Sequence, residues 1–241
     1  ATAPAADSEP AETAAPPQDN PEPSSLALAF EQVKPTAPRQ PQVQAPAPLP
    51  IKPMQMLFEG GNDSLVAIAV GSAEGTRTPT GAITSAYFGH TDPGNRAWNM
   101  GTFSYQHGAS SPEEANQKQL QRLQSQSEYL KKRALKYDLN LTLEEMLNGI
   151  DLANQSPLAA LGRVGYVERL VEARNMGYEG AEAIVVARTR SYINPDTQRW
   201  NAPGLGNTLQ SITRDQQRRA DAVASAIAAY QQKNPDLATT A

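Results

Sequence analysis

The chain has 241 residues, a net charge of −4 and no cysteine. The lack of cysteine excludes disulfides and thiolate metal sites, and the slightly acidic balance excludes a general basic surface for nucleic acid. Since the sequence holds no run of about 18 apolar residues, we also expect no transmembrane segment within it.

Residues 1–53 differ in composition from the rest of the chain. They are dominated by Ala, Pro, Gln, Glu and Ser and hold roughly two-thirds of the prolines. Proline removes a backbone donor, and few large apolar residues are present to offset the entropy of ordering, so we expect a disordered Pro/Ala-rich tether. We expect a second disordered tail at residues 234–241.

The first residue, Ala1, is not a methionine. A mature protein looks like this after removal of a signal or membrane anchor, although a shortened expressed fragment would begin in the same way. We favour removal of a signal, because Pro/Ala-rich tethers commonly follow one. We therefore expect an exported, extracytoplasmic protein of the periplasm or cell envelope, with a possible membrane tether upstream.

Residues 54–233 have the size of one domain and are long enough to bury a core. Asp63 or Ser64 is expected to cap a helix that is apolar on both faces and therefore buried. That helix is expected to end near Glu74, because Gly75 can adopt the left-handed conformation that follows a helix. The pattern predicts a mainly α fold.

Residues 76–108 show no helical periodicity and are rich in Gly, Thr, Pro, Asn and aromatic side chains. We expect a small irregular β and loop region here, with residues 82–88 as a strand or hairpin arm. A non-helical stretch of this length inside a compact domain is typical of a functional segment.

Capping and periodicity signals predict that the rest of the domain is helical. The expected starts of these helices are Ser111, Thr142, Ser156, residue 181, and Asn207 or Thr208. The third of them is expected to run unbroken to Gly177. We interpret Arg214, Arg218 and Arg219 as a solvated face of the last helix.

Glu74 is the residue whose position predicts chemistry. It ends an apolar helix and precedes a glycine and the aromatic-rich segment. Apolar walls and the negative end of a helix disfavour a charged carboxyl group, and a carboxyl that stays protonated can act as a general acid. Cleavage of a glycosidic bond requires such an acid. A solvent-exposed carboxylate at the end of a helix is the alternative.

Three segments within about residues 60–108 resemble the lysozyme-like superfamily. The catalytic glutamate of those enzymes closes the first helix, and its surroundings resemble residues 72–77 (SAEGTR). The Gly-His turn of T4-type lysozymes is similar to residues 87–90 (YFGH). The Gly-rich, aromatic element that lines the cleft of lytic transglycosylases, the lambda type included, resembles residues 100–106 (MGTFSYQ).

The resemblance implies a lysozyme-like helical domain that cleaves the MurNAc–GlcNAc bond of peptidoglycan, with Glu74 as acid and base. It implies no cofactor and no metal, glycan strands as the partner, and a monomer. Two histidines without regular spacing, His90 and His107, do not indicate a metal site. The implied substrate-binding residues are Thr84, Tyr87, His90, Asp92, Phe103, Tyr105 and Gln106. No motif places Tyr166, Tyr178, Tyr192 or Trp200, which are candidates for the far side of the cleft.

One departure from the T4-type pattern leaves the reaction open. Those lysozymes place an aspartate and a threonine at set intervals after the glutamate, and no aspartate lies between Glu74 and Tyr87. Lytic transglycosylases manage with one glutamate, which acts first as acid and then as base toward the muramic acid C6 hydroxyl, closing a 1,6-anhydro ring. A lone Glu74 is compatible with this route, and a muramidase that also uses Asp92 or Thr84 is the alternative.

Two non-enzymatic hypotheses stand beside these. A glycan-binding or scaffold protein of the envelope has the same fold without catalysis, because fold does not imply activity. A helical interaction protein unrelated to glycans is the other, and it predicts an exposed apolar groove between the later helices.

Overall fold

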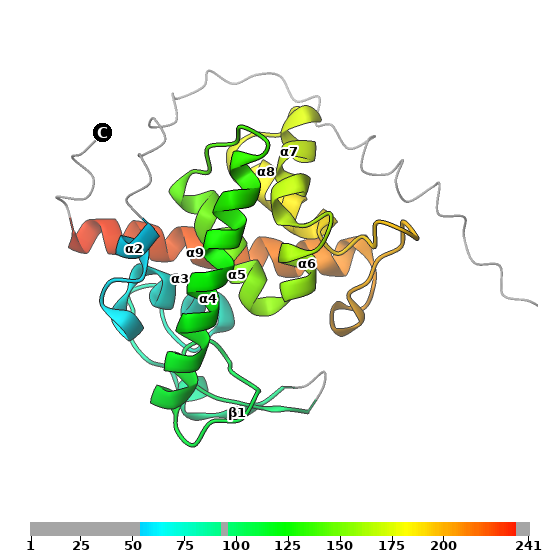
Figure 1. Cartoon of the computed structure of the whole chain (residues 1–241). Helices are drawn as coiled ribbons and strands as arrows, with labels where there is room; N and C mark the ends of the chain where they lie inside the picture. Colours follow the sequence, from blue (N-terminus) through cyan, green and yellow to red (C-terminus); the bar gives the residue numbers. More distant parts are fainter. Residues whose placement is uncertain (1–53, 93–95, 235–241) are drawn as a thin grey trace, which may run out of the picture. The chain divides into compact units, whose positions relative to one another are not determined.

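The computed structural model describes residues 54–92 and 96–234, so the predictions for the tether (1–53) and for nearly all of the C-terminal tail lie outside the described residues. The described part is mainly helical, from Met54 in α2 (Met54–Leu57) to Lys233 in α9 (Leu209–Lys233), with one two-stranded sheet (Figure 1). Within these residues, no helix combines the length and apolar character needed to cross a bilayer.

Helix α3 (Leu65–Glu74) follows the short 3-10 turn η1 (Gly61–Asp63) and carries the candidate glutamate at its last position. The side chain of Ser64 accepts a hydrogen bond from the backbone N of Ala67 at 3.2 Å, and Gly75 adopts φ 77° after the last turn. Both predicted end signals are therefore confirmed. Because α3 is apolar on both faces, it is buried against α9 and α5.

The irregular region contains one antiparallel hairpin, in which β1 (His90–Thr91) pairs with β2 (Trp98–Asn99). The strand or hairpin arm expected over residues 82–88 is present only as an isolated antiparallel bridge at Ile83, and Ser85–Phe88 forms the 3-10 turn η2 instead. Tyr87 is the buried residue of that turn, and its neighbours Ser85 and Phe88 are exposed. Ile83 at the start of this segment forms one isolated antiparallel bridge with Arg77, so β pairing is limited to that end of it.

Helix α5 (Leu143–Gln155) is the centre of the fold, because α3, α4, α8 and α9 all contact it. In Figure 1, α4 (Pro112–Leu135) lies in front of α5, and α9 passes behind α5. The residues of α5 from Glu145 to Ala153 are all buried. The predicted capping box at its start is confirmed, since Thr142 and Glu145 exchange side-chain and backbone hydrogen bonds.

The predicted long helix after Ser156 is two helices, α6 (Pro157–Leu161) and α7 (Tyr166–Asn175). A Cβ atom at Gly165 would lie 2.4 Å from the carbonyl oxygen of Ala160, which shows how closely the backbone approaches itself at the break. Leu158, in α6, is 74% exposed. Helix α8 (Gly180–Arg190) follows, and a connector containing η3 (Pro203–Leu205) leads to α9.

We expect Thr142→Ala to lower the free energy of unfolding by about 1 kcal/mol, because it removes the hydroxyl that caps α5. Urea denaturation monitored by circular dichroism measures the change. Thr197→Ala is the matched control, because Thr197 is exposed and its hydroxyl makes no hydrogen bond to the described residues. Equal losses in the two variants would contradict the capping role.

Candidate active site

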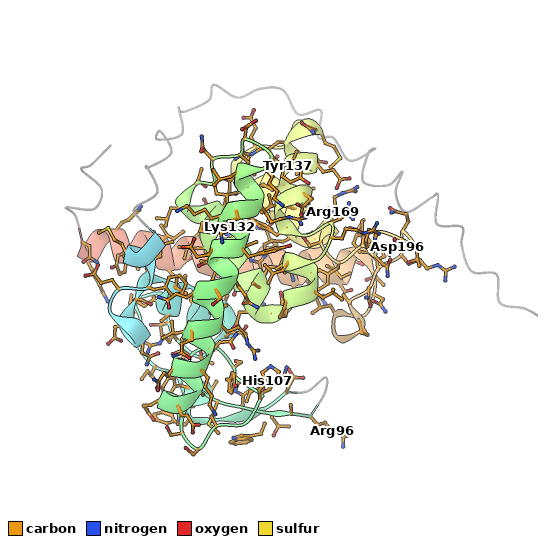
Figure 2. The ribbon with its side chains drawn as sticks, viewed as in Figure 1. Arg96, His107, Lys132, Tyr137, Arg169 and Asp196 are labelled. Atoms are coloured by element: carbon orange, nitrogen blue, oxygen red, sulfur yellow. The ribbon has the colours of Figure 1, made fainter. Side chains whose placement is uncertain are left out.

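A cleft of about 790 Å³ opens at the end of α3. Its volume lies within the range of about 300–1,000 Å³ that ligand sites occupy. One wall comes from the β1–β2 hairpin and the turn after it, and the other comes from the α8–α9 connector. Figure 2 labels Arg96 on the hairpin and Asp196 on the connector, and both project toward the right of the view. The lining residues are Glu74, His90, Asp92, Asn99, Phe103, Ser104, Gln106, Asn154, Gln155, Ser156, Tyr192, Asn201, Ala202, Pro203, Gly204, Leu205 and Arg219.

Glu74 lies in the lining of this cleft with its side chain 15% exposed. Its Oε1 atom accepts hydrogen bonds from Arg219 Nη2 at 2.6 Å and from Asn154 Nδ2 at 2.9 Å. Among the described residues no group donates to Oε2. One carboxyl oxygen is thus fixed by the protein, and the other is available to a ligand.

Asn154 is itself held in place, because it links three elements. Its Nδ2 also donates to the carbonyl oxygen of Phe103 at 3.2 Å, and its Oδ1 accepts from Gln119 Nε2 at 2.8 Å. The amide therefore has one orientation, with Nδ2 toward Glu74. This network fixes the turn that carries Phe103 relative to the catalytic candidate.

Arg219 joins the cleft to a buried charge cluster, and the prediction that it belongs to a solvated face was wrong. Its side chain is 4% exposed, and it donates to Asp151 Oδ2 from Nε at 2.9 Å and to Oδ1 from Nη2 at 2.7 Å. Arg188 donates to the same carboxylate at 2.7 Å, and both Asp151 and Arg188 are fully buried. Two arginines thus share Asp151, and one of them also binds Glu74.

The balance of charge in this cluster favours ionised groups. Burial acts to raise the pKa of Asp151, but Arg219 and Arg188 together outweigh it and hold that pKa below its ordinary value. Burial acts to lower the pKa of Arg219, but Asp151 and Glu74 raise it well above the ordinary value. A permanent positive charge therefore lies beside Glu74, which the expectation of purely apolar walls did not include.

Four of the seven predicted substrate-binding residues line the cleft with Glu74, namely His90, Asp92, Phe103 and Gln106. His90 pairs directly with Asn99 across the hairpin, and directly opposed residues share one face of a sheet. Both residues line the cleft, so that face of the hairpin forms its wall. Phe103 is 2% exposed, and its hydrogen bond from Asn154 is made through its carbonyl oxygen.

The other three predicted residues, Thr84, Tyr87 and Tyr105, are not part of the lining. Thr84 donates its hydroxyl to the carbonyl oxygen of Gly75 at 2.8 Å, which fastens the turn after Glu74. Tyr87 is 3% exposed, and its hydroxyl accepts from Asn116 Nδ2 at 3.1 Å. Tyr105 packs edge-on against His107, which Figure 2 labels near the hairpin.

The sequence analysis did not predict Arg219 as a site residue, although the spacing of apolar residues in its helix indicates that it is buried. The buried residues of α9 include Ile212, Gln216 and Val223, and Arg219 lies on the same face at helical spacing. For Asn154, at the end of α5, the pattern of apolar residues gave no comparable sign of a role in the site. Of the four aromatic residues that no motif placed, Tyr192 lines the cleft, whereas Tyr166 is fully buried elsewhere.

Two polar atoms at the cleft are buried without a hydrogen-bond partner, Asn99 Oδ1 and Ser104 Oγ. Ser104 also adopts φ 50°, a left-handed conformation that is uncommon for a residue other than glycine. Unsatisfied buried polar groups and backbone strain are both rare, and both concentrate at functional sites. Their presence here supports a binding role for this wall.

No group of three or more His, Cys, Asp or Glu side chains within residues 54–92 and 96–234 is arranged to hold a metal ion. No protein-family model, no curated protein and no solved structure matches the chain.

Proposed function

We propose that this chain is a peptidoglycan-cleaving glycosidase of the lysozyme-like kind, acting as a lytic transglycosylase with Glu74 as acid and base. The observation that carries the proposal is the hydrogen bonding of the two Glu74 carboxyl oxygens in the cleft. Protein donors hold Oε1, and Oε2 is available to substrate. A general acid or base needs one such oxygen within reach of the reacting group.

The proposed reaction uses Oε2 twice. With the carboxyl protonated on Oε2, the proton passes to the glycosidic oxygen as the bond from that oxygen to C1 of muramic acid breaks, and the GlcNAc-bearing chain leaves. Glu74 is then a carboxylate, which Arg219 stabilises at 2.6 Å. The carboxylate takes the proton of the C6 hydroxyl while O6 bonds to C1, which closes the 1,6-anhydro ring and restores the acid.

The character of the lining supports a glycan as ligand. Amide and hydroxyl side chains predominate, among them Asn99, Gln106, Asn154 and Asn201, and they match a ligand that carries hydroxyl and acetamido groups. Since the chain is predicted to be exported on a Pro/Ala-rich tether, the cell wall is the glycan that it would meet. A location in the periplasm or envelope is therefore part of the proposal.

Two observations favour second candidates. Asp92 also lines the cleft, so a hydrolase with two carboxylates is the first of them. Glu74 is paired with Arg219, and its Oε1 is fixed by two donors, which also suits a glycan-binding protein that uses Glu74 as a fixed acceptor without catalysis. An interaction protein unrelated to glycans would place Glu74 in open solvent, and Glu74 is only 15% exposed.

Mass spectrometry of the products released from purified sacculi by the wild type and by Glu74→Gln tests the proposal. We expect 1,6-anhydro muropeptides from the wild type alone. Reducing-end products would instead identify a hydrolase, and Asp92→Asn should then also be inactive. Failure of the wild type to release any product over a broad range of pH, together with retained glycan binding, would establish the binding protein.

A further inference from the structure

Tyr192 has a hydroxyl group for which the described residues supply no partner. Tyr192 lines the cleft and is 6% exposed, yet its hydroxyl makes no hydrogen bond to the described residues. Tyr166 also has an unpaired hydroxyl, but Tyr166 is 0% exposed and lines no described cleft. Unlike the Tyr166 hydroxyl, the Tyr192 hydroxyl oxygen is not sealed from solvent, so it is open to the cleft that Tyr192 lines. Because Tyr192 borders a cleft, a ligand in that cleft is the natural partner.

The environment of Tyr192 keeps its hydroxyl protonated. Burial raises the pKa of Tyr192 to about 12, although Arg188 and Arg219 act in the opposite direction. The group therefore stays a neutral O–H donor across the physiological range of pH. A neutral hydroxyl can donate to a sugar oxygen and accept from a sugar hydroxyl.

The segment that carries Tyr192 is fixed by backbone contacts, and we call Tyr192 with residues 201–205 the connector wall. The carbonyl oxygen of Tyr192 accepts from the backbone N of Asn201 at 2.7 Å. Asn207 Oδ1 accepts from the backbone N of Ala202 at 2.6 Å, and its own backbone N donates to the carbonyl oxygen of Ala202 at 3.3 Å. A wall held in this way presents its polar groups without a large ordering cost.

Gly204 is a position of the connector wall with open space beside its backbone. A Cβ atom built on Gly204 meets no atom within 4 Å, and Gly204 does not have a positive φ. A larger side chain at this position is therefore compatible with the backbone, and since Gly204 lines the cleft, we expect it to narrow the cleft. The position offers a way to block the wall without disturbing the fold.

We propose that the connector wall binds the glycan, with the Tyr192 hydroxyl donating a hydrogen bond to an oxygen of an N-acetylated sugar in the cleft. The proposal rests on the proposed function, because it assumes a glycan ligand. Tyr192 acts in binding, and proton transfer stays with Glu74. The wall opposite the hairpin would then set which sugar is accepted.

Binding of a soluble tetrasaccharide of alternating GlcNAc and MurNAc, measured by calorimetry, tests this. The reference protein carries Glu74→Gln, so that the ligand is not consumed. Adding Tyr192→Phe should weaken the affinity about tenfold, the value expected for one lost hydrogen bond of about 1.4 kcal/mol. Adding Gly204→Trp should abolish binding. Tyr137→Phe is the matched control, because Tyr137 is 46% exposed at the end of α4 far from the hairpin (Figure 2).

Each outcome bears on one proposal or on both. Unchanged affinity in Tyr192→Phe and in Gly204→Trp would overturn the role of the connector wall and leave the proposed function intact. If Tyr192→Phe fails to fold, Gly204→Trp decides alone, because its backbone has room for the side chain. If the reference protein binds no tetrasaccharide, the connector-wall proposal fails, and the proposed function fails with it only where wild-type protein also leaves sacculi uncut.

Discussion

Asp151→Asn is expected to lower the free energy of unfolding by about 3–5 kcal/mol, the usual cost of removing one partner from a buried ion pair. Asp151 is fully buried and accepts hydrogen bonds from both Arg219 and Arg188. In the variant Arg219 keeps its ion pair with Glu74, but among the described residues Arg188 keeps only neutral partners such as Gln216 and Asn148. Because Arg188 is 0% exposed, water cannot solvate the charge that has lost its counter-ion. Chemical denaturation at neutral pH measures the loss.

The pH dependence of this effect has a definite sign. The pKa of Asp151 in the folded chain lies below its value of about 3.9 in an unfolded one, because the two arginines outweigh the effect of burial. The stability that Asp151 contributes is therefore fully present above roughly pH 5 and is lost as the pH falls toward the folded-state pKa. The difference between wild type and Asp151→Asn should shrink below about pH 4.

The control for this experiment lies on α9. Asp221 is exposed, and its carboxylate accepts a hydrogen bond from Gln217. Asp221→Asn should change the free energy of unfolding by less than about 0.5 kcal/mol. A loss of similar size in both aspartate variants would show that the ion pairs of Asp151 with Arg188 and Arg219 do not stabilise the fold.

Signals that act within a few residues of the chain predicted the helices well. Ser64 and Gly75 bound α3, and Thr142 starts α5 as expected, because caps depend on local hydrogen bonds. Over residues 82–88 only Ile83 makes a β-bridge, with Arg77, and Ser85–Phe88 instead forms η2, in which Tyr87 is buried. The prediction of one unbroken helix after Ser156 was wrong, because Gly162 and Gly165 allow a close approach of the backbone between α6 and α7. The spacing of apolar residues carries no signal for such an approach.

In the candidate site, too, residues with a local sequence signal were predicted, and residues that depend on distant contacts were missed. Glu74 was found from its place at a helix end, His90 from the Gly-His motif, and Asp92 only as a carboxylate that lies close to that motif in the sequence. Arg219 and Asn154 reach Glu74 across 145 and 80 residues of sequence, so no local pattern could join them to it. Arg219 was predicted to be solvated because it is charged. Its place on the buried face of α9, in line with Ile212, Gln216 and Val223, was not taken into account.

Glu74→Gln is expected to reduce the rate of glycan cleavage by about 10²- to 10⁴-fold, the range that a general acid and base contributes. Glutamine has nearly the same shape, and its Oε1 can still accept from Arg219 and from Asn154. Arg219 also keeps both of its bonds to Asp151. The cleft should therefore stay formed, and the lost function should be proton transfer at the Oε2 position.

The measurement is the initial rate of muropeptide release from sacculi, with thermal unfolding and tetrasaccharide affinity recorded for the same samples. Glu128→Gln is the matched control, because Glu128 is exposed on α4 and is not part of the cleft lining. We expect the Glu74 variant to keep its fold and its affinity while its rate falls. If Glu74→Gln and Glu128→Gln release product equally fast, Glu74 is not the acid, and its hydrogen bonds to Arg219 and Asn154 serve only to fasten the end of α3 to α9 and α5.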